Sequence, residues 1–337
     1  MKKIKAAVVG LAGVLALTAC SASGSSGSAD QLSVVGFSVL EAANEPVFAD
    51  FKATDAGKGV DFQTSYGASG DQSRAVEGGL KADYVHFSLE PDIQRLVDDN
   101  LVAPDWNTGP TKGIVTSSVV VFVVRPGNPK HIEGWDDLIK PGVQIITPNP
   151  ASSGSAKWNI LAAWAHITGN GGTEAQAKEF VKKFLGNTIA LPSSAREATT
   201  AFSGGNGDVL ISYENEAIVA RQKGEDFDYL VPDDTLKIEN PGAVTIDANP
   251  KAKDFLDFLL TPAAQEDYAA FGFRPVIDGV TLPQVEGAND PANPFPVPAK
   301  LFTIADLFGG WSVANDKFFD DETGIIPALQ AETGKTE

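Results

Sequence analysis

The feature that most constrains this fold is a regular alternation of strand-like and helix-like runs. Apolar runs at residues 32–37 and 60–66 read as strands, and residues 45–56 between them read as a helix. Residues 115–125 form a long β-branched run that would be buried on both faces if it lay in a parallel sheet. Because the alternation continues to residue 213, it predicts an α/β fold, and 337 residues suffice for two lobes.

Three short Ser/Gly stretches each follow a strand or loop and open a predicted helix: residues 67–70, 152–155 and 193–195. The first turn of a helix carries unpaired N–H groups and a partial positive charge. Small residues there let an oxyanion come close to the backbone. Because the first two stretches contain no Lys or Arg, the pattern predicts an anion held by hydrogen-bond donors rather than by countercharge.

Each stretch also has an ordinary structural interpretation. Ser69 or Asp71 could simply cap a helix, which is worth about 1 kcal/mol, and Ser153 has the same ambiguity. Gly154 favours the site, since it has no side chain to shield the neighbouring N–H groups. Ala195 could contribute only its backbone N–H.

Two further residues each have both a structural and a functional interpretation. Arg196 could form a surface salt bridge, or it could supply an outer-shell charge or a hinge contact. Tyr213 ends the apolar run 208–212, and ligands bind beyond the carboxyl ends of strands in open α/β sheets. Its phenol can donate one hydrogen bond, although a buried core tyrosine fits the pattern equally well.

Charge and composition exclude several classes of binding partner. The formal net charge of −18 argues against nucleic acid or an anionic membrane surface as a general partner. Three histidines, at 86, 131 and 166, lack ligand spacing, so the sequence predicts no metal site and no cofactor. A single cysteine excludes an intrachain disulfide.

The N-terminus has the pattern of a targeting segment. Three lysines precede an apolar stretch at residues 6–19, which ends in Leu17-Thr18-Ala19-Cys20 and resembles a bacterial lipobox. We expect a signal peptide at 1–19, a lipidated Cys20 and a Ser/Gly-rich tether at 20–31. The alternative is an ordinary signal peptide with a cysteine there by chance. Either way the chain is expected to be exported.

Catalytic motifs are missing from the sequence. It contains neither Gly-x-Ser-x-Gly nor a phosphate-binding Gly-x-x-x-x-Gly-Lys-Ser/Thr loop, and its histidines lie outside the Ser/Gly stretches. A secreted serine hydrolase would need a base within reach of Ser69 or Ser153. An adhesion or scaffold lipoprotein would need no buried donor cluster. The sequence therefore predicts a binding protein and not an enzyme.

Longer motifs carry a resemblance that covers nearly all of the mature chain. The chain resembles the periplasmic sulfate-binding proteins that feed ABC sulfate importers, in a lipoprotein form anchored outside the cell membrane. The motifs are SYGASGDQ (65–72), RPGNPK (125–130), WDDLIKPGV (135–143), ITPNP (146–150), SSG (152–154) with WN (158–159), GDVLI (207–211), ENEA (214–217), LFTI (301–304) and FGGW (308–311).

This resemblance implies a two-lobed periplasmic-binding-protein fold, type II-like, in which a monomer closes on sulfate and delivers it to an ABC permease. Lobe one would comprise residues 32–117 and 240–337, with its C-terminal part free to pack on lobe two at 118–239. The segment at 279–300, rich in Pro and Asn, is expected to be extended.

The resemblance also implies the ligand contacts. In the family about seven neutral hydrogen bonds hold the buried dianion. Tyr213 stands where the family has an indole donor, Ser155 where it has a glycine, and an Asp usual near the first strand is replaced around Val39. The donors carried over are the hydroxyl and N–H of Ser69, the hydroxyl of Ser153 and the N–H groups of Gly154, Ser155 and Ala195, with Gly70, Asp71 and Arg196 around them.

Protonation favours sulfate over phosphate, whereas thiosulfate, molybdate and tungstate stay open as alternative ligands. Sulfate is fully deprotonated at neutral pH, so donors alone can satisfy it. Phosphate keeps a proton and needs an acceptor. Asp71 is the acceptor nearest in sequence, and we expect it on the outward side of its helix. Rejection of phosphate would then follow from an unpaired buried donor.

Overall fold

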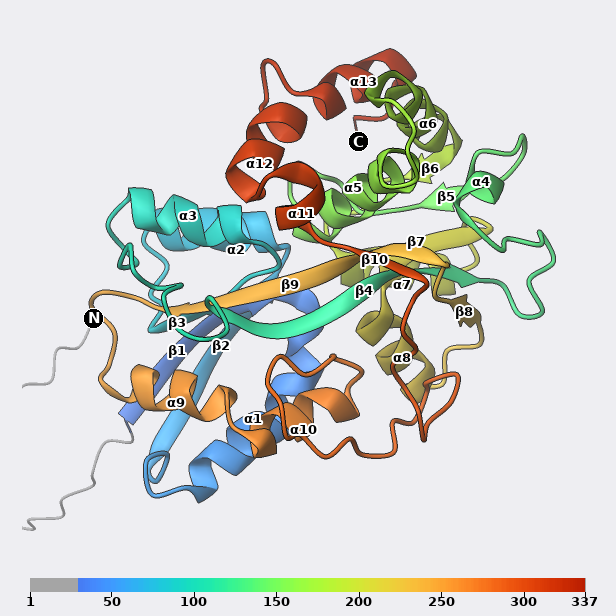
Figure 1. Ribbon diagram of the computed structural model, residues 1–337. Coiled ribbons are helices and arrows are strands. Elements are labelled where there is room, and N and C mark those ends of the chain that lie inside the picture. The colour runs from blue at the N-terminus through green and yellow to red at the C-terminus, as the bar shows by residue number, and fades with distance from the viewer. Residues whose placement is uncertain (1–29, 337) are drawn as a thin grey trace, which may run out of the picture.

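The computed structural model describes residues 30–336, and its centre is one mixed sheet of ten strands flanked by helices (Figure 1). Cys20, the predicted signal peptide and residues 20–29 of the predicted tether lie outside the described residues. The first strand begins at Asp30, so the last two residues of the predicted tether already belong to the sheet. The predicted α/β class is confirmed.

The sheet has two halves joined by two long strands (Figure 1). In the first half β1 pairs in parallel with β2 and β3, and in the second half β5 pairs in parallel with β6 and β7. Between them β4 and β9 pair antiparallel. In sheet order the strands are β2 (Val60–Gly67), β1 (Asp30–Phe37), β3 (Tyr84–His86), β9 (Asp234–Val244), β4 (Ile114–Val124), β7 (Val209–Tyr213), β5 (Ile145–Ile146) and β6 (Thr188–Ala190), with β8 (Asp228–Leu230) beside β4 and β10 (Lys300–Phe302) beside β9.

Strand β4 is buried from Val115 onward, as its β-branched sequence predicted. Its surroundings differ from the expected parallel sheet, because β7, β8 and β9 all run antiparallel to it. Helices and the packed C-terminal segments cover both faces, so burial of the strand does not require parallel neighbours. The strand also passes from one half of the molecule to the other, which no local pattern indicates.

Helices cover both faces of the first half (Figure 1). Helices α2 and α3 pack against each other, and α1 packs against α10 on the opposite side. Under α1 and α9 lies an aromatic cluster, in which Phe48 stacks on Phe62 and Phe51 meets Phe255 edge to face. The elements are η1 (Ser38–Leu40), α1 (Glu41–Ala53), α2 (Ser69–Glu77), α3 (Glu90–Asp98), α9 (Lys251–Leu259) and α10 (Pro262–Ala270).

The second half carries its own helices and the C-terminal ones. Helix α5 packs on α6, and α13 packs on α6 from the other side. Trp158 of α5 meets Trp311 of α12 edge to face, with ring centroids 4.7 Å apart. These elements are α4 (Trp135–Leu138), α5 (Gly154–Thr168), α6 (Glu174–Asn187), α7 (Ala195–Ser203), α8 (Glu214–Gln222), α11 (Ile304–Phe308), α12 (Trp311–Phe319) and α13 (Ile325–Thr333).

A third connection between the halves passes through Arg274. Its N–H donates to the carbonyl of Ser117 in β4 at 2.8 Å. Its guanidinium holds both carboxylate oxygens of Glu214, at 2.7 and 3.0 Å, and this carboxylate is fully buried. The chain then runs from 275 to 299 without a helix or strand and includes several turns and bends, and Lys300 at the end of the segment expected to be extended already belongs to β10.

A half-buried histidine ties β9 to the second half. The imidazole Nδ1 of His166 lies 2.8 Å from Asp234 at the start of β9, and its Nε2 lies 3.6 Å from Asp136. Burial alone would lower the pKa of His166. The hydrogen bond and charge of Asp234, together with the charge of Asp136, outweigh burial and raise the pKa above 6.5.

We expect the stability conferred by His166 to depend on pH. Because the folded pKa is raised, this contribution is complete below about pH 6 and is lost as the pH rises through the folded pKa. His166→Gln should therefore lower the free energy of unfolding by about 1 kcal/mol more at pH 5.5 than at pH 9. Thermal melts of both proteins at the two pH values measure this difference. His131→Asn, at an exposed imidazole, is the control. Equal losses at both pH values would contradict the assignment.

Candidate anion-binding site

The three helix starts that the sequence singled out meet between the two halves of the sheet. Helix α2 begins at Ser69 in the first half, and α5 and α7 begin at Gly154 and Ala195 in the second. The N–H of Gly70 donates to the carbonyl of Ser152 at 3.0 Å, and the hydroxyl of Ser152 donates to the carbonyl of Ser193 at 2.7 Å. The loop before α5 therefore contacts the start of both other helices.

The start of α5 presents a cluster of small buried groups. Ser153, Gly154 and Ser155 are all buried. The N–H of Ser153 donates to the carbonyl of Asn149 at 2.8 Å, so the hydroxyl of Ser153 is the group that it can still offer to a ligand. The N–H groups of Gly154 and Ser155 are in the first turn and have no partner within the helix. The hydroxyl of Ser155 is buried without a hydrogen-bond partner among the described residues.

Ser69 does not have the role expected of its side chain. Its hydroxyl donates to Asp92 at 2.6 Å and accepts from the N–H of Ser88 at 2.9 Å. Because a serine has one hydroxyl proton, none remains for a ligand. The predicted hydroxyl contact is therefore wrong in this structure. The N–H of Ser69, in the first turn of α2, is the group that this residue can still offer.

The start of α7 offers backbone rather than side chains. Ser194 caps the helix by accepting from the N–H of Glu197, so Ala195 is its first residue. Ala195 is buried, and its N–H lies in the first turn. Arg196 turns away to Glu216, whose buried carboxylate it approaches at 3.0 Å. This partly buried ion pair joins α7 to α8.

Tyr213 ends β7 and is completely buried. Its hydroxyl lies 2.6 Å from the hydroxyl of Ser88, across the boundary between the halves. Burial raises the pKa of Tyr213, only partly offset by the hydrogen bond with Ser88 and the nearby polar groups of Ser155 and Asn240, so the phenol remains protonated at neutral pH. A neutral phenol can donate to an anion.

Gly70 and Asp71 lie beside the site in different ways. The N–H of Gly70 is used in the contact with Ser152, and a Cβ on Gly70 would lie 2.9 Å from the carbonyl oxygen of Ser152. Asp71 is exposed and pairs with Arg74 on the outer side of α2. Asp71 therefore offers no acceptor to the buried groups.

Sequence reasoning missed three residues of this region: Ser88, Asp92 and Asn240. Ser88 follows the carboxyl end of β3, and that position is itself a signal in an α/β sheet. Asp92 lies in the first turn of α3, where a carboxylate is favourable, and Arg95 lies 3.3 Å from it. Asn240 belongs to β9, and only the fold brings it to Ser88.

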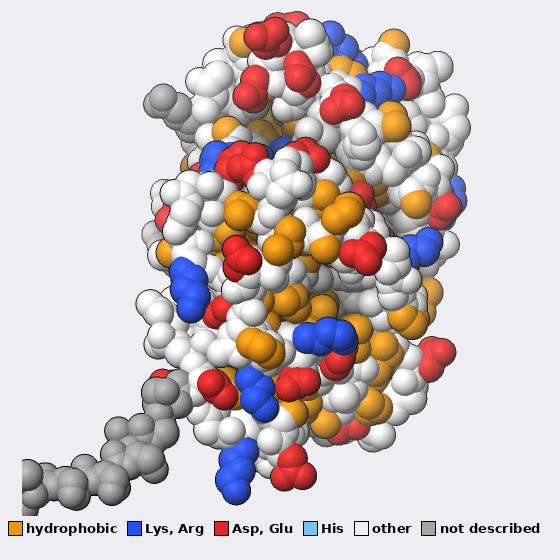
Figure 2. All heavy atoms as spheres, turned by 90° about the vertical axis from the view of Figure 1, so that its left-hand side faces the viewer, with side chains coloured by type: hydrophobic (Ala, Val, Ile, Leu, Met, Phe, Trp, Pro, Cys, Tyr) orange, Lys and Arg blue, Asp and Glu red, His pale blue; other side chains and the backbone are white. Residues whose placement is uncertain are grey.

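The buried groups offer donors with no cationic partner. Within residues 30–336 no Lys, Arg or His side chain forms a hydrogen bond with Ser153, Ser155 or Tyr213. In the same range no cluster of three or more His, Cys, Asp or Glu side chains could hold a metal ion. Figure 2 shows acidic and basic side chains interspersed over the face of the molecule that lies to the left in Figure 1. Donor groups, rather than a charged patch, distinguish this region.

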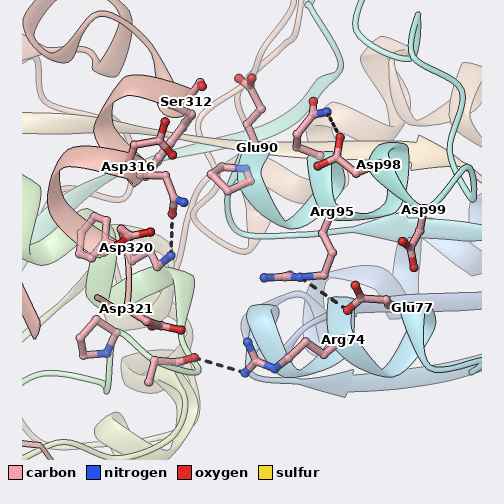
Figure 3. A pocket seen from close by; sticks show the side chains of 18 residues that line it. Arg74, Glu77, Glu90, Arg95, Asp98, Asp99, Ser312, Asp316, Asp320 and Asp321 are labelled. Carbon is pink, nitrogen blue, oxygen red and sulfur yellow. Dashed lines mark hydrogen bonds and ion pairs between the residues drawn. The ribbon is translucent and has the colours of Figure 1, made fainter. Parts of the chain in front are cut away.

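A separate groove on the surface is lined by charged side chains rather than by neutral donors. It measures about 880 Å³ and lies between helices α2 and α3 on one side and α12 on the other (Figure 3). Seven acidic side chains line it beside Arg74, Arg95 and Lys157. Arg74 donates across it to the carbonyl of Ala151, and Arg95 pairs with Glu77. The excess of carboxylates makes this groove a poor site for an anion.

Comparison with known proteins agrees with this geometry. Residues 32–274 match the family model described as bacterial extracellular solute-binding protein. A sulfate-binding protein of Synechococcus elongatus is 41% identical, covering 98% of this chain and 97% of its own. A thiosulfate-binding protein of Pseudomonas aeruginosa is 35% identical over 82% of this chain and 84% of its own. The solved structure of the sulfate-binding protein SubI from Mycobacterium tuberculosis H37Rv is 47% identical, with a TM-score of 0.80, over 86% of this chain and all of SubI.

The family match and the close relatives identify the class of this chain as a solute-binding protein rather than an enzyme. The chain belongs to the bacterial extracellular solute-binding protein family, in the group of the sulfate-binding proteins. The family resemblance deduced from the sequence motifs is thereby confirmed. Members of such a family act outside the cytoplasm. No helix within residues 30–336 is both long and apolar enough to cross a membrane.

The absence of a side chain at Gly154 is required where the halves meet. A Cβ there would lie 2.5 Å from the hydroxyl oxygen of Ser88 and 2.8 Å from Leu89. We expect Gly154→Ala to destabilise this arrangement by about 1–3 kcal/mol, seen as a lower melting temperature or as a larger radius of gyration in small-angle scattering. Gly109→Ala, where a methyl would meet open space, is the control. If the two variants behaved alike, the close contact between halves would be unsupported.

Proposed function

We propose that this protein captures sulfate between its two halves and delivers it to an ABC permease for import. The observation that supports it best is that three helix starts meet two buried hydroxyls, from Ser153 and Tyr213, and that neither hydroxyl has a cationic hydrogen-bond partner within residues 30–336. The proposed donors are the N–H groups of Ser69, Gly154, Ser155 and Ala195 together with these two hydroxyls. The sulfate-binding relatives support this choice of ligand.

A buried dianion can be stable here without a countercharge. Each helix start contributes unpaired N–H groups and the positive end of its dipole. Hydrogen bonds to a charged acceptor are worth more than those between neutral groups, about 1.5–3 kcal/mol each. Several such bonds offset the cost of removing the anion from water. They also avoid burial of a lysine or arginine.

The two halves of the sheet serve in this proposal as lobes that close over the anion. Three crossings join them, through β4, through β9 and near Arg274. The proposed division falls at 117/118 and 239/240, within β4 and β9 and close to Arg274. Contacts such as Gly70 to Ser152 and Ser88 to Tyr213 would form on closure. The closed form would then be the state that the permease recognises.

The same proposal places the protein on the outer face of the cell membrane as a monomer, held by lipid on Cys20. The lipobox-like sequence before Cys20 and the family's extracellular description support this location. The single cysteine stands at the position that lipidation needs.

Thiosulfate is the second candidate ligand. A thiosulfate-binding relative is 35% identical, and thiosulfate is also a tetrahedral dianion without a proton at neutral pH. The same donors would therefore satisfy it. Calorimetric titrations with each anion separate the two, since the proposal requires the tighter binding for sulfate.

Removal of the Ser153 hydroxyl should weaken sulfate binding without unfolding the protein. Loss of one hydrogen bond to a charged ligand predicts a Kd roughly 10- to 100-fold higher for Ser153→Ala in calorimetry. Thr200→Ala removes an exposed hydroxyl that bonds within α7, and it should bind as the wild type does. An unchanged Kd for Ser153→Ala would remove this hydroxyl from the site.

Phosphate should bind at least about a hundredfold more weakly than sulfate at pH 7. At that pH phosphate carries a proton that needs an acceptor, and Asp92 is already occupied by Ser69 and Arg95. Selenate, a tetrahedral dianion without a proton, is the positive control in the same titrations. Phosphate binding as tight as that of sulfate would show that an acceptor faces the anion.

A further inference from the structure

Ser88 is the residue in which the bonds of this region converge. It lies in the loop between β3 and α3 and is 1% exposed. Its N–H donates to the hydroxyl of Ser69 at 2.9 Å. Its carbonyl accepts from the amide Nδ2 of Asn240 and from the indole Nε1 of Trp158, both at 2.9 Å. Backbone bonds on both sides therefore hold this serine in place.

The bonds of Ser88 connect both halves of the molecule and the strand β9 that joins them. Ser69 belongs to the first half and Asn240 to the connecting strand β9. Trp158 and Tyr213 belong to the second half. The hydroxyl of Ser88 lies 2.6 Å from the hydroxyl of Tyr213, 125 positions away. Because the two residues sit on opposite halves, this contact exists only when the halves meet.

Tyr213, the other member of the pair, has an aromatic neighbour in the first half. The phenol ring lies 6.4 Å from the ring of Phe37, at the end of β1. Either hydroxyl can donate to the other. In both cases the accepting hydroxyl keeps its own proton, which it can donate to a third group. The hydroxyl of Ser155 is close enough to Tyr213 to affect its pKa and is otherwise without a partner. The contact thus borders the buried donor cluster.

We propose that the hydroxyl pair of Ser88 and Tyr213 is a latch that holds the two halves together over the bound anion and slows its release. Ser88 is then a positioning residue, which acts through Tyr213 and the closed arrangement. This inference rests on the proposed function, since it needs a bound anion whose release can be timed.

The test measures the release rate of radiolabelled sulfate after a chase with excess unlabelled sulfate. Ser88→Ala and Tyr213→Phe each remove one side of the same hydrogen bond and keep the backbone or ring. Loss of one neutral buried hydrogen bond is expected to raise such a release rate about fivefold. We expect Ser88→Ala to release sulfate about fivefold faster, with the association rate unchanged. Tyr213→Phe should release sulfate faster still, because it also removes a proposed donor to the anion. The double variant should release sulfate at the rate of Tyr213→Phe alone, because Ser88→Ala then finds no latch bond left to break.

Two controls remove equally buried hydroxyls whose bonds stay within the first half. Ser73 bonds to the carbonyl of Asp92, and Tyr268 bonds to Asn44. Ser73→Ala and Tyr268→Phe should lower the melting temperature and leave the release rate unchanged. These controls separate a latch from a general loss of packing.

The outcomes distinguish the latch from the function on which it rests. If the wild type bound no sulfate in calorimetry, the proposed function would fail before the latch was tested. If the wild type bound sulfate but Ser88→Ala released it at the wild-type rate, the latch would be wrong. A double variant that was about fivefold faster than Tyr213→Phe alone, as two independent effects require, would equally overturn the pairing.

Discussion

Backbone N–H groups at the start of a helix cannot be satisfied by that helix, and this constraint shapes the whole molecule. Three helices begin at the boundary between the two halves of the sheet, at Ser69, Gly154 and Ala195. Some of their donors bond across the boundary, as Gly70 does to Ser152. In the proposed function the others bind sulfate. The ligand would then complete hydrogen bonding that the fold leaves open, and this would link binding to closure.

The strands β4 and β9 make this arrangement possible. They run antiparallel through the centre and connect two groups of otherwise parallel strands (Figure 1). Parallel strands with crossover helices place helix starts at the carboxyl ends of strands, and each half does so on the side that faces the other. Buried ion pairs near the crossings, Arg274 with Glu214 and Arg196 with Glu216, stiffen the surroundings of α8 and leave the anion region itself without cations.

Much of this could be predicted from local sequence. The strands and helices up to Tyr213 follow from periodicity, and the helix starts follow from short runs of Ser, Gly and Ala. Asp71 was expected on the outer side of its helix, where it pairs with Arg74. The Ser69 hydroxyl was assigned wrongly, because its partner Asp92 lies 23 residues away and no local rule pairs them. Asn240 was missed for the same reason, since it meets Ser88 152 positions away, whereas the place of Ser88 after a strand was a local signal that went unused.

The sequence by itself determined the class, an exported α/β binding protein, and it predicted the kind of site that we propose, with donors and no countercharge. Composition and the positions of small residues are local properties, so they can be recognised without a fold. Only the tertiary structure decided which hydroxyls are already occupied, which glycines must lack a side chain, and that Ser88 meets Tyr213. Those properties depend on contacts between distant segments, and they form only when β4 and β9 bring the two halves together.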